Sequence, residues 1–306
     1  MQSTNHILLV RPLNFIFNKE TAKSNTFQRA INESDDLIRE NVISEFNAFA
    51  AVLISKGVHV TIMDDTISPQ KPDAVFPNNW ASFHADGKVI LYPLCAENRR
   101  HERRQDIIDS IKKNFVVKEV IDLSYYEKDN RFLEGTGSII FDHENTMAYA
   151  CLSPRTDREI FIQVCKSLSY RPVAFHSHDR NGKEVYHTNV MMCIGSAFSV
   201  ICLESITNKQ ERSEVADLLA SSGHQIIDIS FDQMERFAGN MLTIQTMDNK
   251  EILVMSESAF DSLSKTQVNE LEKYCELVPQ PIKTIETIGG GSARCMIAEI
   301  FLQPAD

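Results

Sequence analysis

The chain lacks an apolar run long enough to cross a bilayer, and no basic stretch followed by an apolar one opens it. It also lacks a basic block: 42 acidic and 31 basic residues are spread over 306 positions and give a net charge of -11. These absences argue against a membrane protein, a secretory signal and a surface for nucleic acid or anionic lipid. We expect a cytoplasmic protein that binds neither nucleic acid nor membrane and whose partner is a small molecule.

Cysteine pairs with metal-ligand spacing are also missing. The seven cysteines are odd in number and form no Cys-x-x-Cys pair, which argues against a disulfide framework and a zinc site. Most of them are expected to be buried small hydrophobic residues. His176 and His178 form a His-x-His pair in a polar loop, a weak metal motif without a third ligand. We therefore expect no metal.

What the chain does have is an internal repeat. Four segments read as strand, turn, strand: 78–94, 135–152, 188–203 and 239–256. Each is followed by a stretch with helical spacing of apolar residues, namely 96–113, 156–168, 208–221 and 257–274, and then by a short apolar strand. The repeating unit is therefore strand-strand-helix-strand.

The first residues of the hairpins set the period of this repeat. Taken as Asn79, Glu134, His187, Gly239 and Cys295, they lie 52 to 56 residues apart. This period predicts an α/β fold of about five modules around a pseudo-fivefold axis, as in a propeller, with one domain over residues 1–306. A short strand within 293–302 is expected to pair with the N-terminal segment HILLVRP and close the ring.

Residues at equivalent places in such modules converge at one end of the axis, so an amide, an acid, an imidazole and a thiol should meet there. Cys295 ends the segment ETIGGGSARC, in which three glycines present backbone amides and Arg294 adds a positive charge. Such surroundings favour a nucleophilic thiolate. The alternative is a glycine-rich turn that leads into an edge strand with a buried cysteine.

The other two candidates complete a catalytic triad with Cys295. His187 suits a general acid and base because the ordinary pKa of histidine lies near neutrality. Glu134, between apolar residues and two glycines, is expected to be partly buried and to need a partner, for which His187 is the obvious one. The alternative for Glu134 is a glutamate in a turn before a strand.

The segments EGTGS, HTNV and GGGSARCM, together with the period near fifty, resemble the guanidino-group-modifying superfamily. This superfamily has the pentein fold and includes arginine deiminases, dimethylarginine dimethylaminohydrolases and amidinotransferases. The resemblance covers essentially the whole chain. It implies that Cys295 attacks the central carbon of a guanidino-type group, with His187 as general acid and base and Glu134 as its partner.

The resemblance also implies residues that bind a substrate. Arg155 looks like the family arginine that grips the substrate carboxylate, a task suited to a guanidinium fork, and Arg100 is a second candidate whose alternative is a solvated helix face. Asp73 resembles a family carboxylate that lines the site and meets a substrate amine. Arg294 and Asn78 are counted with these residues, although Asn78 either takes part or holds the loop.

The departure from the family lies in the amides. Deiminases and dimethylaminohydrolases have acidic residues where this chain has Asn78 and Asn79, and deiminases have an aspartate where it has Asn189. A buried guanidinium needs such negative charge, whereas a neutral ureido group needs both donors and acceptors, which asparagine supplies. The amides therefore favour citrulline, and the motif set most resembles the citrulline-utilisation hydrolases of CtlX type, or citrulline ureidases.

The expected reaction is hydrolysis of citrulline to ornithine, carbon dioxide and ammonia. It runs through an S-carbamoyl intermediate on Cys295, with Asn79 or Asn189 donating to the oxyanion, and it requires no metal or organic cofactor. The first alternative is an arginine deiminase, a dimethylarginine dimethylaminohydrolase or an amidinotransferase acting on a guanidino substrate. The second is a non-catalytic ligand-binding protein with the same fold. A homo-oligomer is left open.

Overall fold

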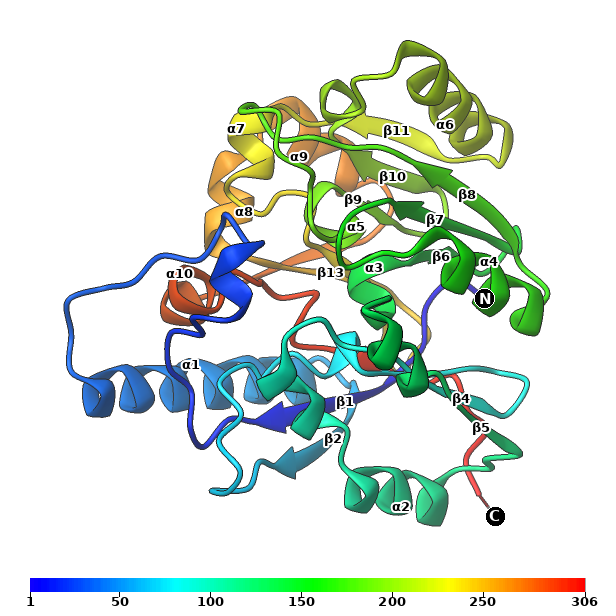
Figure 1. Ribbon diagram of the computed structural model, residues 1–306. Coiled ribbons are helices and arrows are strands. Elements are labelled where there is room, and N and C mark those ends of the chain that lie inside the picture. The colour runs from blue at the N-terminus through cyan, green and yellow to red at the C-terminus, as the bar shows by residue number, and fades with distance from the viewer. Residues whose placement is uncertain (306) are drawn as a thin grey trace.

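Five three-stranded sheets of one design make up the chain, of which the computed structural model describes residues 1–305 (Figure 1). In every sheet the central strand pairs antiparallel with one neighbour and parallel with the other. The sheets are β15 (Ala298–Glu299), β1 (His6–Arg11) and β2 (His59–Asp64); β3 (Ala81–Phe83), β4 (Lys88–Leu91) and β5 (Glu119–Asp122); β6 (Ile140–Asp142), β7 (Met147–Cys151) and β8 (Arg171–Phe175); β9 (Met192–Ile194), β10 (Phe198–Ile201) and β11 (Gln225–Asp228); β12 (Leu242–Gln245), β13 (Glu251–Ser256) and β14 (Glu276–Gln280).

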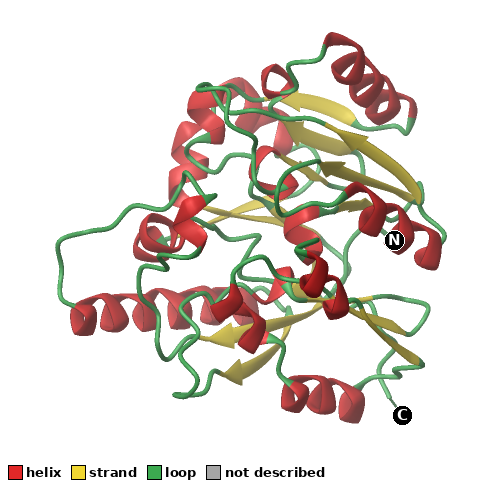
Figure 2. Cartoon of the chain, viewed as in Figure 1, coloured by secondary structure: helices red, strands yellow, loops and turns green. Residues whose placement is uncertain are grey.

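Helices connect the parallel strands and lie mostly outside the sheets (Figure 2). They are α1 (Asp35–Ser55), α2 (Gln105–Asn114), α4 (Arg158–Leu168), α6 (Lys209–Ser221), and α8 (Glu257–Ser262) with α9 (Lys265–Leu271). The helix expected over 257–274 is thus broken, because Ser264 caps a new helix through a reciprocal pair of hydrogen bonds with Gln267. The helix expected over 96–113 is likewise divided into the 3-10 helix η3 (Glu97–Glu102) and α2.

The remaining helical segments are short. They are η1 (Thr21–Lys23), η2 (Pro77–Asn79), η4 (Ser124–Asp129), η5 (Leu203–Ser205), α3 (Gly135–Ser138), α5 (Thr188–Met191), α7 (Phe231–Met234) and α10 (Lys283–Gly289). Among the described residues, no helix has both the length and the apolarity that crossing a bilayer would need.

The two ends of the chain meet in the first sheet. β15 pairs antiparallel with β1, with Ile7 opposite Glu299 and Leu8 opposite Ala298. This confirms the predicted pairing of the final strand with the N-terminal one, and the five strand-strand-helix-strand modules of the predicted α/β fold are present. The first module therefore takes one strand from the C-terminal end of the chain and two from the N-terminal end.

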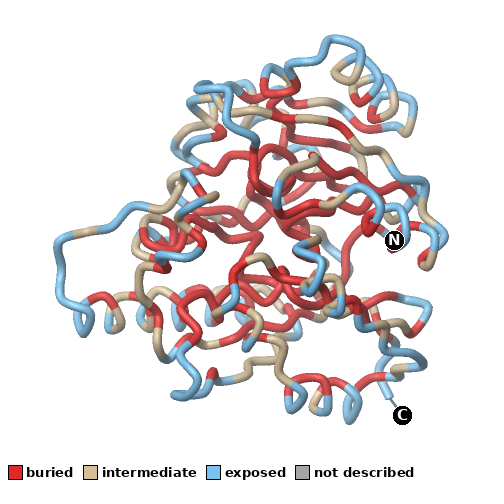
Figure 3. Tube along the Cα trace, in the orientation of Figure 1, coloured by how far each residue is buried: buried red, intermediate tan, exposed pale blue. Residues whose placement is uncertain are grey.

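The hydrophobic core follows from helical spacing. In α1 the buried residues recur at intervals of three and four, so one face of the helix packs against the sheet and α10 while the other faces solvent. These residues are Ile38, Val42, Phe46, Phe49 and Leu53. Figure 3 shows the buried chain running through the middle of the molecule, with exposed segments on the outer helices and loops.

The residues that open the modules lie in turns just before the strands. Asn79 ends η2, Glu134 precedes α3 and His187 precedes α5. The carbonyl groups of Glu134 and His187 each accept a hydrogen bond from the amide three residues on, at 3.1 and 3.2 Å. The sequence predicts these residues at the start of strands. In the structure, a single helical turn comes between each residue and its strand. These turns place the side chains at the same end of each sheet.

Because Leu8 is fully buried in the ring-closing strand, Leu8→Ala should lower the free energy of unfolding by about 2–5 kcal/mol through lost burial and a residual cavity. Urea denaturation followed by circular dichroism measures this change. Leu37→Ala, at a position 44% exposed on α1, is the control and should change stability by less than about 0.5 kcal/mol. Equal losses in the two variants would contradict a structural role for the closure.

Candidate active site

A small cavity lies where the module-opening turns converge. Five of the candidate residues predicted from the sequence line it: Asp73, Asn79, Arg155, His187 and Cys295. All five are buried. The free volume of about 10 Å³ has room for roughly one water molecule, so a larger ligand requires the cavity to widen.

His187 and Glu134 form a buried pair in this cavity. Nε2 of His187 lies 2.8 Å from Oε2 of Glu134, whose other oxygen accepts from the amide of Cys95. Burial would raise the pKa of Glu134, but Arg155, His187 and Arg99 bring it well below its ordinary value. Burial lowers the pKa of His187 to about 4, against the opposing effect of Glu134, so the imidazole is neutral at neutral pH. The proton then sits on Nε2, facing the carboxylate, and Nδ1 carries the lone pair.

Cys295 is enclosed by amides. Its Sγ accepts hydrogen bonds from Nδ2 of Asn189 and Nδ2 of Asn240, both at 3.2 Å. Burial raises the pKa of the thiol, while the Ser292 backbone and the two asparagines act in the opposite direction. Asn189 was selected from the sequence as a substrate contact; here its amide group holds the sulfur and does not line the cavity.

Asn240 was missed by sequence reasoning. It directly follows Gly239, the first residue of the fourth module in the predicted repeat. A shift of one residue in that alignment would have placed an asparagine beside Asn79, Glu134 and His187, so the repeat itself held the signal.

Arg99, and not Arg100, enters the cavity. Its guanidinium binds Glu102 through two bonds of 2.9 and 2.8 Å and donates to Oδ1 of Asn79 at 2.6 Å. Arg100, selected from the sequence, instead donates to the Leu94 carbonyl and lies 3.4 Å from Glu127. Successive residues of a 3-10 helix point about 120° apart, so only one of two adjacent arginines can face inward. The expectation for Arg100 is corrected accordingly.

Arg294 also departs from expectation. Its guanidinium donates to Glu299 at 2.9 Å and to the Ile297 carbonyl at 3.1 Å, and it lines a different small cavity. The largely buried carboxylate of Glu299, five residues further along the chain in β15, needs a cation and pairs with Arg294. Cys295 therefore has no arginine in direct contact, and Arg294 is not a residue of this cavity.

Asp73 and Asn78 have different positions in the site. Asp73 lines the cavity: Oδ2 accepts from Asn18 at 2.8 Å, while Oδ1 is buried without a partner. Burial raises the pKa of this carboxyl, against the effect of Arg99. Asn78 is fully buried beneath Asn79, from whose Nδ2 it accepts at 2.9 Å, and it does not line the cavity.

The N-terminal segment 18–29, called the strap below, covers the cavity. Arg155 donates to Oγ of Ser24 at 2.6 and 2.9 Å and to the Thr21 carbonyl at 2.9 Å. Asn25 donates to the Gly290 carbonyl at 3.1 Å and so fastens the strap to the glycine-rich turn before Cys295. A ligand that binds this side of the Arg155 guanidinium must displace these contacts.

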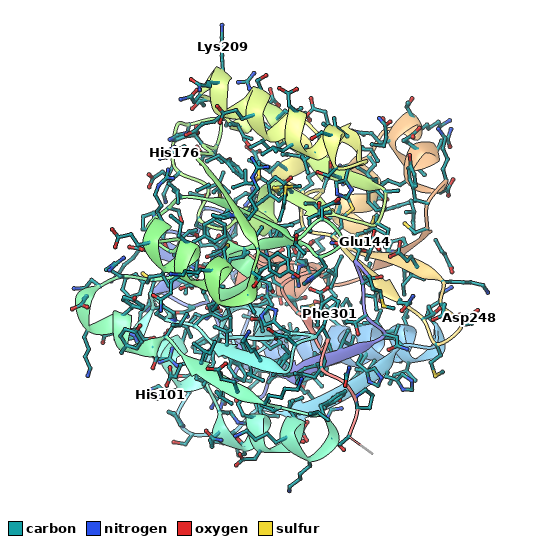
Figure 4. All side chains as sticks on the ribbon, turned by 90° about the vertical axis from the view of Figure 1, so that its right-hand side faces the viewer. His101, Glu144, His176, Lys209, Asp248 and Phe301 are labelled. Atoms are coloured by element: carbon teal, nitrogen blue, oxygen red, sulfur yellow. The ribbon has the colours of Figure 1, made fainter. Side chains whose placement is uncertain are left out.

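The His-x-His pair lies elsewhere. Nδ1 of His176 is 3.0 Å from Glu211 and Nδ1 of His178 is 3.2 Å from Thr207, and Figure 4 shows His176 near the edge of the molecule. Within residues 1–305, no three His, Cys, Asp or Glu side chains are placed to hold a metal ion. All seven cysteines are free, and all except Cys95 are buried.

Structures of known proteins share this fold. ArgZ, an arginine dihydrolase from the ornithine-ammonia cycle in cyanobacteria, is 18% identical with a TM-score of 0.75; the alignment covers 98% of this chain and 41% of ArgZ. The N-terminal domain of ArgZ bound to substrate is 18% identical, with coverage of 97% and 99% and a TM-score of 0.74. DDAH from Pseudomonas aeruginosa, complexed with citrulline, is 14% identical, with coverage of 97% and 100% and a TM-score of 0.69.

Family membership rests on the sequence itself. No curated protein sequence matches the chain. The family model for eukaryotic N,N dimethylarginine dimethylhydrolase, however, matches residues 11–302, which is nearly the whole chain. The chain therefore belongs to this family of hydrolases that act on carbon–nitrogen bonds, within the guanidino-group-modifying superfamily of pentein fold.

Proposed function

We propose that the chain is a cysteine-dependent hydrolase of the ureido group of citrulline, like the CtlX-type hydrolases that its motifs resemble. The observation that carries the proposal is the set of neutral amides around the sulfur. Asn79 lines the cavity with His187 and Cys295, and Asn189 and Asn240 donate to Sγ of Cys295. Amide groups can both donate to and accept from a neutral ureido group, whereas a buried guanidinium is better matched by carboxylates.

The amino-acid end of citrulline, with its carboxylate and ammonium, fits Arg155 and Asp73. Arg155 offers a guanidinium fork for the substrate carboxylate once the strap has released it. The partnerless Oδ1 of Asp73 offers an acceptor for the substrate ammonium. Because the carboxylate and the ammonium are themselves balanced, this leaves the uncharged ureido group for Asn79, His187 and Cys295.

The proposed reaction has two steps. In the first, the thiol proton passes to Nδ1 of His187, Sγ of Cys295 attacks the ureido carbon, and the imidazolium gives its proton to the departing ornithine nitrogen. In the second, His187 takes a proton from water, which attacks the S-carbamoyl carbon and expels the thiolate. Carbamate is released and decomposes to carbon dioxide and ammonia. Glu134 stabilises the transient imidazolium through its 2.8 Å contact.

A guanidino substrate is the second candidate. It is favoured by the three buried carboxylates Asp73, Glu102 and Glu134, which outnumber the buried Arg99 and Arg155, and by the relatives, which include an arginine dihydrolase and a DDAH. An arginine deiminase, a dimethylarginine dimethylaminohydrolase and an amidinotransferase all fall within this candidate. A non-catalytic binding protein is the third, and it predicts equal ligand binding by the wild type and Cys295→Ala, with no turnover in either.

Incubation with citrulline should release ornithine and ammonia in equal amounts, whereas arginine should remain largely unchanged, because the amides beside Cys295 match a neutral ureido group better than a cationic guanidinium. Chromatography of the amino acids and an ammonia assay measure both reactions. Cys295→Ala is the inactive control. Release of citrulline from arginine, with no ornithine formed from citrulline, would overturn the proposal.

Asn79→Asp should lower kcat/KM for citrulline by at least about tenfold, because the new carboxylate repels the ureido oxygen and competes for Arg99. The ratio of arginine to citrulline turnover should rise at the same time. Steady-state kinetics on both substrates provide the test, with Asn181→Asp on an exposed loop as the matched control. An unchanged ratio would show that Asn79 does not set the substrate.

Gly137→Ala should reduce kcat by about 100-fold, since a Cβ there would lie 2.5 Å from Nδ2 of Asn79 and 2.7 Å from Nδ1 of His187. Both side chains are fixed by other hydrogen bonds and cannot yield freely. Gly182→Ala is the control: a Cβ there would meet no atom within 4 Å, and although the φ of 78° makes the variant somewhat less stable, the folded enzyme should keep full activity. An unchanged kcat in Gly137→Ala would show that Asn79 and His187 do not act in the reaction from these positions.

A further inference from the structure

The environment of Cys295 poses a chemical problem. The sulfur is buried, and burial disfavours the thiolate. Enzymes with cysteine nucleophiles commonly stabilise the thiolate with a nearby cation. Here Arg294 is paired with Glu299, and His187 is neutral at neutral pH. The side chains that donate to Sγ directly are neutral amides, so these contacts are the nearest source of stabilisation for the thiolate.

We propose that Asn240 and Asn189 form an amide cradle that stabilises the thiolate of Cys295, and that Asn240 is its central member. The inference rests on the proposed function in one respect, namely that Cys295 is the nucleophile. The cradle consists of the two side-chain NH2 groups that lie 3.2 Å from Sγ on separate modules.

The geometry of Asn240 suits both protonation states of the sulfur. Its Oδ1 lies 3.6 Å from Sγ and accepts from the thiol, whereas its Nδ2 lies 3.2 Å away and donates to the thiolate. The same Nδ2 also donates to the Asn189 carbonyl at 2.8 Å, which fixes the plane of the amide. Loss of the thiol proton therefore requires no movement of the side chain.

The backbone before Asn240 is shaped to bring it to the sulfur. A Cβ on Gly239 would lie 2.4 Å from the Val190 carbonyl, so only glycine allows this turn to pack against α5. The amide of Asn240 bonds the Phe237 carbonyl at 2.8 Å, and Phe237 itself has a φ of 63°. The close approach at Gly239 and the positive φ of Phe237 thus both shape the turn that holds Asn240, whose side chain contacts Sγ.

The experiment is a titration of the Cys295 thiol without substrate. Thiolate absorbance near 240 nm is followed against pH, and the curve of Cys295→Ala is subtracted so that only this cysteine is counted. Asn240→Ala should raise the apparent pKa of the thiol by about one unit, and Asn240→Asp, of the same shape but negatively charged, should raise it further. Alkylation by iodoacetamide at neutral pH should slow about tenfold in Asn240→Ala, with mass spectrometry locating the modified residue.

Ser199→Ala is the control, because Ser199 is a buried polar residue of the neighbouring module, which also contains Asn189, and it makes no hydrogen bond to Sγ; the Cys295 thiol of this variant should titrate as in the wild type. An unchanged thiol pKa in both folded Asn240 variants would overturn the proposal and leave Asn240 a packing residue. If Asn240→Ala fails to fold, Asn240→Asp alone decides. The titration uses no substrate, so the two proposals can fail independently. A shifted thiol pKa would support the amide cradle even if citrulline is not hydrolysed. Citrulline turnover would support the proposed function even if the thiol pKa does not shift.

Discussion

The site depends on the burial of Glu134. A carboxylate removed from water is costly unless opposite charges and donors surround it, and Glu134 has them from its own module and from two others. His187 contacts it at 2.8 Å, Arg155 at 3.4 Å and Arg99 at 4.0 Å. Through these contacts the carboxylate fixes the imidazole ring, holds Arg155 at the cavity and draws Arg99 inward. The modules therefore meet at this point through charge contacts to Glu134 as well as through the arrangement of the sheets.

The repeat explains how such a cluster arises from one chain. Each module is a local hairpin followed by a helix and a strand, and its first residue is held by a turn with its own hydrogen bonds. Because five such turns face one end of the molecule, side chains far apart in sequence meet without long loops. The cost is that the first module must be assembled from both ends of the chain, through the pairing of β1 with β15.

The modules and the convergence of Asn79, Glu134, His187 and Cys295 could be predicted because they follow from local patterns and a regular period. Two other features could not. The choice between Arg99 and Arg100 depends on the rotation of a single 3-10 turn, to which neighbouring residues contribute equally. The direction of Arg294 depends on its contacts with Glu299 and the Ile297 carbonyl, which are set by the path of the chain after Cys295. Both depend on contacts that form after the local elements are in place.

The hydrogen bonds between the strap and Arg155 have a consequence for which compounds the proposed reaction would exclude. In the proposed reaction, the substrate carboxylate displaces Ser24 and the Thr21 carbonyl from Arg155. Substrate selection would then take place at the amino-acid end of the substrate, remote from the carbon that reacts. Urea and other carbamoyl compounds without a carboxylate would not displace these contacts, and the proposed reaction would leave them unchanged.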